Sequence, residues 1–373
     1  MFNHFLIYST IIANKRKLVI FLKKVLKSIG IILLALILCV VLLFGWLSIT
    51  EFKPESVESL EISTNDDAAT LQIGNTISVV TWNIGYAGLG KGSDFFMDGG
   101  ENVRSADEDT VNSYLSGIQS ATSQGDVYGD IFLFQEADKD SKRSYHIDET
   151  ESLLNNSNTY ALNFSCNYVP YPWPTIGKVN SGLLTASKFS IESANRISLP
   201  CPFKWPVRMA NLKRCLSANY LPIDGTDKYL VVVNLHLEAY DDGSGKIAQT
   251  NQLKEFIQSE YEKGNYVIAG GDFNQEFPGA LDVYPNTHPD LWSPGSLDES
   301  MIPDGWTYAY DLSNPSCRLL NQPYDPDDTE NTQYYLIDGF IVSPNLIVNG
   351  VRTIQQNFEN TDHNPVRVSI TIN

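Results

Sequence analysis

Residues 29 to 49 form an almost wholly apolar stretch without a single charged side chain. As an α-helix, these 21 residues would be about 30 Å long, which is the thickness of the hydrocarbon core of a bilayer. Six basic residues and no acidic ones occur among the first fifty, and all six precede the stretch. Because Lys and Arg concentrate on the cytoplasmic side of membrane helices, residues 1 to 28 are expected to be cytoplasmic and the rest extracytoplasmic. The sequence therefore predicts a single-pass transmembrane helix in the cell membrane.

A cleaved signal peptide is the alternative interpretation of this stretch. The stretch is longer than the apolar region of a typical signal peptide, and no Ala-x-Ala site follows it between Gly45 and Pro54. Lipid attachment at Cys39 is also disfavoured, because Leu38 stands where a small residue is needed and Cys39 lies in the middle of the stretch. We therefore expect the helix to be retained as a membrane anchor.

The remainder of the chain is strongly acidic. Residues 51 to 373 carry 20 basic and 44 acidic side chains, which gives a net charge of −24. Such a surface repels polyanions at long range and argues against tight, non-specific binding to a nucleic-acid backbone. It does not exclude a nuclease with a local basic groove.

The chain after the apolar stretch is expected to have two parts. Residues 50 to 74 are rich in Glu, Ser, Thr and Asp and show little apolar periodicity, so they are predicted to form a stalk or linker. Residues 75 to 373 are enough for one domain with a single packed core. Within them, helical spacing is present over residues 107–124 and 245–263, between apolar segments typical of strands.

The tetrad Gly271-Asp272-Phe273-Asn274 follows the apolar segment 266–269. Residues two apart on a strand point the same way, so Asp272 and Asn274 are expected to converge while Phe273 packs behind them. An ionised Asp can accept a proton from water, and an Asn can fix the position of its neighbour. By itself the tetrad is also a good turn sequence.

Other apolar segments also carry or end with polar side chains. The segment 229–238 alternates, so that Val232, Asn234, His236 and Glu238 share one face and Val231, Val233, Leu235 and Leu237 share the other. Asp338 lies inside an apolar segment, where an ionised carboxylate needs a partner, and His363 is the expected one. The polar positions at or near segment ends are Asn83, Gln135, Glu136, His236, Asp338, Asp362 and His363.

Together these motifs resemble the endonuclease/exonuclease/phosphatase superfamily, the deoxyribonuclease I-like proteins. The resemblance runs from about residue 77 to residue 372. It implies an α/β fold in which two mixed sheets pack face to face between helices, a four-layer α/β/β/α sandwich. The matching segments are Thr81–Asn83, Phe134–Glu136, Asn234–Leu237, Gly271–Asn274, Ile337–Val342 and Thr361–Val366.

The resemblance also implies a chemistry, the hydrolysis of a phosphate mono- or diester. Glu136 would bind a divalent metal, Mg²⁺ with Mn²⁺ as the alternative, and Asn83 and Asp362 would complete or support the oxygen shell. Asp272 would activate the attacking water and Asn274 would orient Asp272. His236 and His363 would donate as cations to phosphate oxygens, with Asp338 holding His363. In relatives the His236 position has a carboxylate partner, and Glu238 is the candidate for it here.

The substrate is less constrained than the chemistry. The Pro- and aromatic-rich segments 168–174 and 200–206 could form an apolar wall at the mouth of the site, or could be structural loops. A lipid-derived or small phosphate ester is the first choice, a surface nuclease is the alternative, and a catalytically inactive binding module is the second alternative. No protein partner is inferred. Candidate phosphate contacts are Lys178, Arg208 and Arg214.

The four cysteines after the apolar stretch show no CxxC pair and no zinc spacing. Reduced, packed cysteines are the favoured state. A disulfide between Cys201 and Cys215 stays open as an alternative if a hairpin brings them together.

Overall fold

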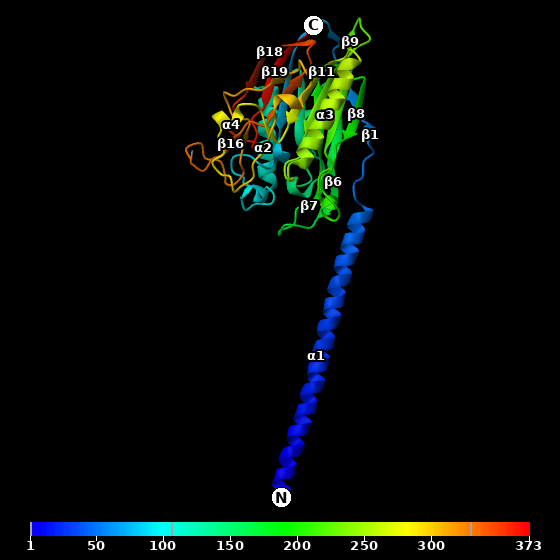
Figure 1. The fold of residues 1–373 in the computed structure, drawn as a ribbon, viewed down its shortest axis with the longest axis vertical. Helices are drawn as coiled ribbons and strands as arrows, with labels where there is room; N and C mark the ends of the chain where they lie inside the picture. Colours follow the sequence, from blue (N-terminus) through cyan, green and yellow to red (C-terminus); the bar gives the residue numbers. More distant parts are fainter. Residues whose placement is uncertain (1, 106, 329) are drawn as a thin grey trace. The chain divides into compact units, whose positions relative to one another are not determined.

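The computed structural model describes residues 2–105, 107–328 and 330–373, and describes the side chains of these ranges from residue 14 onward. The chain forms two compact units, one ending at Glu51 and one covering Phe52–Asn373. Figure 1 shows the first unit as a single helix, α1 (Phe2–Ile49). Among the described residues, one helix is long and apolar enough to cross a membrane, and it is the Asn14–Ile49 part of α1. The uncharged stretch 29–49 is its C-terminal part.

The larger sheet of the second unit has eight strands in the order β1-β8-β9-β10-β11-β17-β14, and β3 also pairs with β9. β10 and β11 are parallel, whereas β17 is antiparallel to β11. The strands are β1 (Val57–Ser59), β3 (Leu71–Gln72), β8 (Ser193–Ser198), β9 (Cys215–Asp224), β10 (Tyr229–His236), β11 (Tyr266–Asp272), β14 (Thr307–Ala309) and β17 (Asp338–Val342).

The second sheet has seven strands in the order β18-β19-β4-β5-β7-β6-β2. β4 and β5 are parallel and β19 is antiparallel to β4. The strands are β2 (Ile62–Thr64), β4 (Thr76–Asn83), β5 (Ile131–Asp138), β6 (Ser157–Val169), β7 (Gly177–Ser187), β18 (Leu346–Thr353) and β19 (Val366–Ile372).

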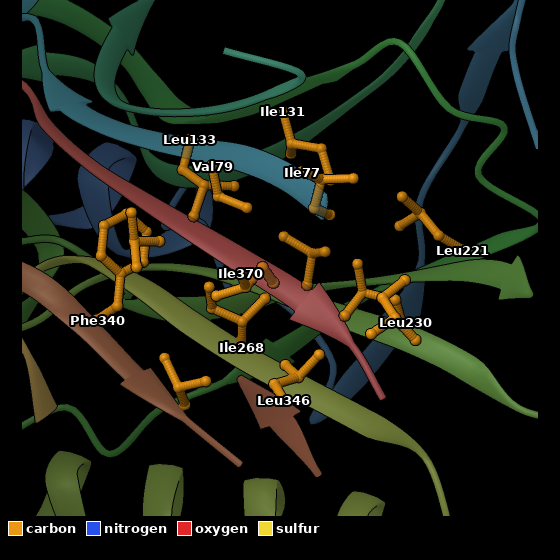
Figure 2. Close-up of a cluster of buried hydrophobic side chains, with 14 of the residues drawn as sticks. Ile77, Val79, Ile131, Leu133, Leu221, Leu230, Ile268, Phe340, Leu346 and Ile370 are labelled. Carbon is orange, nitrogen blue, oxygen red and sulfur yellow. The ribbon is translucent and has the colours of Figure 1, made fainter. Parts of the chain in front are cut away.

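The two sheets pack face to face over an apolar core. Figure 2 shows Val79 and Leu133 of the smaller sheet near Ile268 and Phe340 of the larger one. Each of these side chains is fully buried. The predicted alternation of β10 is confirmed, because Val232 faces this inner core whereas Val231 and its partners face the outer one.

Helices cover the outer faces of both sheets. α3 (Ser244–Glu262) buries Leu253 and Ile257 against β10 and β11 of the larger sheet. α2 (Glu108–Ser123) buries Ile118 against β4 and β5 of the smaller sheet, and the Asp107 side chain caps its N-terminus by accepting from Thr110 N. The predicted four-layer α/β/β/α arrangement is therefore confirmed.

Short elements complete the unit. α4 is a single turn, Ala280–Val283. Two-stranded ribbons join β12 (Gln275–Glu276) to β13 (Gly295–Ser296) and β15 (Cys317–Arg318) to β16 (Tyr334–Tyr335). The 3-10 helices are η1 (Gly85–Ala87), η2 (Phe96–Asp98), η3 (Lys142–Ser144), η4 (Glu149–Leu153), η5 (Val207–Ala210) and η6 (Glu299–Met301).

Part of the segment 50–74, expected to be a stalk, is instead paired with the sheets. β1 pairs with β8, β2 with β6 and β3 with β9. Scattered apolar side chains explain the difference, because Leu71 is fully buried and Leu60 and Ile62 pack against the core. In a segment rich in polar residues, a few separate apolar side chains give no periodic pattern that would predict a strand.

The cysteines are unpaired in the described structure. Cys166, Cys215 and Cys317 are buried, whereas Cys201 is half-buried.

Candidate active site

Strand register brings three predicted residues together on the larger sheet. His236 is directly opposite Asp272 across the parallel pair β10 and β11, and Asp272 is opposite Asp338 across the antiparallel pair β11 and β17. Gly271 permits this pairing, since a Cβ there would lie 1.9 Å from the backbone oxygen of Leu235. The tetrad that begins with Gly271 is therefore the end of a central strand, not only a turn.

The smaller sheet supplies the other half of the site. Asn83 at the end of β4 is opposite Gln135 of β5, and Glu136 follows at a bulge of β5. The φ of Glu136 is 53°, a left-handed conformation that is rare outside glycine and turns its side chain out of the regular alternation. Asp362 and His363 lie in the segment just before β19, separated from it by two residues, and Trp82 Nε1 donates to the backbone oxygen of His363.

Asp272 is the centre of the resulting network. Its Oδ2 accepts a hydrogen bond from Asn83 Nδ2 at 3.0 Å and lies 3.4 Å from His236 Nε2. Its Oδ1 accepts from the backbone N–H of Asn274 at 2.9 Å. Burial, and then the charge of Asp338, raise the pKa of Asp272. A carboxylate with a raised pKa is a suitable proton acceptor near neutral pH.

Asn274 has its own geometry. It adopts a left-handed conformation with φ at 50°, and its side-chain amide donates to the backbone oxygen of Leu237. Phe273 between the two polar residues is fully buried in the core under α3, as the alternation predicted.

His363 and Asp338 form the predicted buried pair. His363 Nδ1 lies 2.8 Å from Asp338 Oδ2. Burial by itself would lower the pKa of His363, but the charge of Asp338 outweighs it and holds that pKa well above its usual range. His363 is therefore doubly protonated near neutral pH, and its Nε2 lies 3.8 Å from both Asp272 Oδ2 and Asp362 Oδ2.

His236 differs from the expectation of a cationic donor. Burial, and then the positive charge of Arg214, lower its pKa well below the usual range, so this imidazole is neutral. Glu238 is not its partner. Glu238 Oε2 lies 3.7 Å from Arg214 Nε, and Glu238 Oε1 accepts from the backbone N–H of Ala239. His236 Nδ1 is buried without a hydrogen-bond partner in the described structure.

Most of these residues line one pocket, whereas Asn83 and Asp338 lie outside its wall and contact residues that line it. The catalytic candidates in its wall are His236, Asp272, Asn274 and His363, and Glu136 and Asp362 join them. The rest of the wall is largely aromatic and aliphatic. It includes Leu89, Phe95, Met97, Phe164, Val169, Tyr171, Ile176, Leu212 and Trp292.

A family model described as Endonuclease/Exonuclease/phosphatase family matches residues 80–355. The chain belongs to the endonuclease/exonuclease/phosphatase family. Members of this family are usually metal-dependent hydrolases of phosphate esters. No curated protein sequence matches the chain significantly.

Three solved structures are similar to this chain. A family protein from Bacteroides thetaiotaomicron is 16% identical with a TM-score of 0.50, covering 80% of this chain and 99% of that one. A mannosyl-6-phosphatase of the same organism is 17% identical with a TM-score of 0.49, covering 79% and 99%. A Beutenbergia cavernae protein is 14% identical with a TM-score of 0.48, covering 80% and 72%. At these identities the likeness concerns the fold alone.

The donor atoms fit the metal that the family requires. Glu136 and Asp362 share the pocket, and burial together with the charge of Glu136 raises the pKa of Asp362, although His363 opposes this. Two carboxylates that repel each other in a buried pocket are stabilised by a divalent cation. Asn83 directs its Nδ2 toward Glu136 Oε1 at 3.2 Å, so its side chain supports Glu136 in this arrangement.

Two other groups of acidic, His and Cys side chains lie close enough to hold a metal among the described residues. Both contain His363, one with Cys317 and Asp362 and the other with Asp272 and Asp338. Burial raises the pKa of Cys317 to about 12, so this thiol stays protonated and is a poor metal ligand. The second group is the acid and base network described above.

The three predicted phosphate contacts separate in the structure. Arg214 lines the pocket next to His236. Lys178 is not part of the pocket wall and pairs with Asp140. Arg208 is likewise outside the wall, on η5, where its backbone oxygen accepts from Lys213 Nζ. Proximity along the chain to an aromatic segment was a weak signal for a phosphate contact.

Sequence reasoning missed two further arginines of the pocket wall, Arg143 and Arg318. Arg143 lies in the pocket wall, binds Asp138 through two hydrogen bonds of 2.8 Å and stacks 3.8 Å from the ring centre of Tyr86. Asp138 is two residues after Glu136 on β5. That spacing is the signal that could have identified the pair, because a second carboxylate near the metal side of the site needs a cation.

A buried carboxyl group outside the predicted set also lines the pocket. Asp98 accepts a hydrogen bond from the hydroxyl of Tyr240 at 2.9 Å. Burial raises the pKa of Asp98 to about 7. No motif pointed to this residue, since η2 is a single turn in an irregular loop.

Proposed function

We propose that the protein is a membrane-anchored, outward-facing phosphoesterase that hydrolyses a phosphate mono- or diester by attack of a water molecule activated by Asp272. The observation that carries this proposal is the network around Asp272, in which Asn83, Asn274 and two histidines converge on one buried carboxylate. The family assignment supports hydrolysis of a phosphate ester as the reaction class.

Asp272 is the general base in this proposal. Asn83 Nδ2 and the backbone N–H of Asn274 each donate to a different oxygen of the carboxylate, which fixes its plane. A fixed carboxylate with a raised pKa takes the proton of a water molecule that lies beside it in the pocket. No covalent intermediate with the protein is required.

The two histidines have different roles. His363 is cationic because of Asp338, and it donates from Nε2 to a phosphate oxygen as negative charge develops there. His236 is neutral and donates from one nitrogen, Nε2, which is on the Asp272 side of the ring. Arg214, on the pocket wall beside His236, adds a second positive charge for the phosphate.

Glu136 and Asp362 would hold the metal ion, and Asn83 would orient Glu136. Mg²⁺ is proposed, with Mn²⁺ as an alternative, because the donors are oxygens. When bound, such an ion neutralises charge on the phosphate oxygens.

The test is hydrolysis of p-nitrophenyl phosphate, bis(p-nitrophenyl) phosphate and plasmid DNA by the full chain in detergent, with Mg²⁺, with Mn²⁺ and with EDTA. We expect EDTA to abolish turnover, and Asp272→Ala and His363→Ala each to lower kcat by about 100-fold or more. Lys178→Ala is the matched control, since this residue is outside the pocket wall and should leave kcat unchanged.

Activity that survives EDTA, or survives both substitutions, would refute the mechanism. Cleavage of DNA alone would instead identify the surface nuclease. An inactive binding module would turn over none of the three substrates.

A further inference from the structure

Two loops of the second unit expose large apolar side chains. The turn between β6 and β7, residues 170–176, exposes 47% of Tyr171 and 91% of Trp173. The loop between β8 and β9, residues 199–214, exposes 58% of Trp205 and 51% of Val207. We call these four side chains the aromatic collar. Exposed tryptophans in neighbouring loops are uncommon on a surface that meets only water.

The two loops that carry the collar also contribute to the wall of the catalytic pocket. Tyr171 and Ile176 from the first loop line the pocket, and so do Ala210 and Leu212 from the second. The two loops are also joined at their bases, where the backbone N–H of Lys213 donates to the oxygen of Asn163 in β6. A substrate that enters the pocket between the loops therefore passes the collar.

The charge of the collar loops is opposite to that of the rest of the unit. Residues 170–176 carry no charge, and residues 199–214 carry no acidic side chain and four basic ones, of which Lys204, Arg208 and Lys213 are exposed or half-buried, whereas Arg214 is buried and pairs with Glu238. The unit as a whole, Phe52–Asn373, carries 20 basic and 43 acidic side chains, a net charge of −23. Lys204, next to Trp205, is exposed. A local concentration of aromatic and basic side chains matches an anionic lipid surface, where Trp and Tyr favour the headgroup region and Lys contacts phosphate.

The chain enters the second unit next to the second collar loop. The backbone N–H of Ser198 donates to the oxygen of Ser56, and its hydroxyl donates to the oxygen of Glu55. Ser198 ends β8, and the collar loop begins at the next residue. α1 ends at Ile49, and the seven residues from there to Ser56 can extend at most roughly 25 Å. A membrane anchored through α1 is thus within reach of the start of this loop.

We propose that the aromatic collar inserts into the headgroup region of an anionic phospholipid bilayer and that the substrate is a phospholipid whose phosphate group enters the pocket between the two loops. The collar contact stands on exposure, charge and chain entry. The substrate class rests on the proposed function, because it assumes that the pocket hydrolyses a phosphate ester. The apolar wall beyond the collar, with Phe164, Val169 and Leu212, would hold the nonpolar part next to the headgroup.

The contact is tested by fluorescence quenching in vesicles of phosphatidylcholine and phosphatidylglycerol that contain doxyl-labelled lipid. The full chain is reconstituted as wild type, as Trp173→Phe/Trp205→Phe and as Trp306→Phe, a control that removes a buried tryptophan. In the wild type, the labelled lipid should quench Trp46 in α1 and also Trp173 and Trp205. In the double variant it should quench only Trp46, and in the Trp306→Phe control the quenching should equal that of the wild type. Identical quenching in wild type and double variant would overturn the collar contact.

The substrate class is tested by a comparison of two activities in the same vesicles. Trp173→Ser/Trp205→Ser should lower hydrolysis of phospholipid by about ten-fold and hydrolysis of soluble bis(p-nitrophenyl) phosphate by less than about two-fold. Leu281→Ser/Val283→Ser, which changes two exposed side chains of α4, should lower neither.

Equal losses on both substrates, or no loss on the phospholipid, would overturn the phospholipid assignment. Failure of the proposed function is distinguishable, because the wild type would then hydrolyse neither substrate while the quenching difference remained.

Discussion

At the scale of single residues, the site is a balance of two buried carboxylates on adjacent strands. Asp272 and Asp338 are directly opposite each other, and burial and then the charge of Asp338 raise the pKa of Asp272. His363 compensates Asp338, while hydrogen bonds from Asn83 and Asn274 compensate Asp272. Asp338 therefore keeps His363 cationic as the proposed donor, whereas Asp272, which has neutral hydrogen-bond partners, is the proposed base.

Gly271 determines whether β11 can hold Asp272 in this position. Replacing it with Ala would place a Cβ 1.9 Å from the backbone oxygen of Leu235, so β10 and β11 must separate. We predict that Gly271→Ala lowers the free energy of unfolding by about 3 kcal/mol and reduces turnover. Gly350→Ala is the control, because a Cβ added there would meet no atom within 4 Å, and it should cost less than about 0.5 kcal/mol. Guanidinium unfolding of the full chain in detergent measures both, and equal midpoints would contradict the close-approach argument.

At the scale of elements, Asn234 joins the two sheets beneath the site. Its Nδ2 donates to the backbone oxygens of Phe134 and Leu184 in the smaller sheet, and its Oδ1 accepts from Gln135 Nε2 at 2.8 Å. Gln135 directly precedes Glu136 on β5, and Asn234 lies two residues before His236 on β10. The bonds therefore set the spacing between the metal side and the base side of the pocket.

We predict that Asn234→Leu lowers the free energy of unfolding by about 3 kcal/mol, because three polar groups in the core each lose one hydrogen bond. Asn349→Leu, at an exposed position bonded to Thr371, should have little effect. Gln135→Leu combined with Asn234→Leu should lower the free energy of unfolding by less than the sum of the two single substitutions. Each single variant leaves one side-chain amide without its partner in the Gln135–Asn234 hydrogen bond, whereas the double variant contains neither amide. Additive losses in this double-mutant cycle would contradict a direct coupling between the sheets.

At the scale of the whole molecule, α1 is proposed to anchor the protein in the cell membrane with the catalytic unit outside. The length and composition of its Asn14–Ile49 part are sufficient for a span, and the basic residues precede the uncharged stretch. This topology would give the enzyme access to substrates on the outer surface.

The topology is tested in cells that express the full chain with an epitope at its N-terminus. We predict that the protein resists extraction with alkaline carbonate, and that protease added outside degrades the catalytic unit but leaves the epitope intact. Replacing Lys15, Arg16 and Lys17 with Gln should lower the fraction with this orientation. Release of a shortened soluble protein would identify the stretch as a cleaved signal peptide instead.

Much of the fold could be predicted because its signals are local. The alternation of β10 assigned Val232 to one face and Val231 to the other, since a strand has a period of two residues. Helical spacing placed α2 and α3 to within one residue of their ends. The segment 50–74 was not predictable in this way, because its short strands depend on partners that are distant in the chain, as in the pairing of Leu71 with Ile223.

The sequence by itself determined which polar side chains stand at strand ends and that Asp338 needs His363, because both conclusions depend on strand period and on the cost of a buried charge. Only the tertiary structure decided that Glu238 binds Arg214, that burial keeps His236 neutral, that Arg143 rather than Lys178 lines the pocket, and that the loops of the aromatic collar border it. The physical reason is that these contacts depend on the order and register of strands that are far apart in the chain, and local patterns carry no information about either.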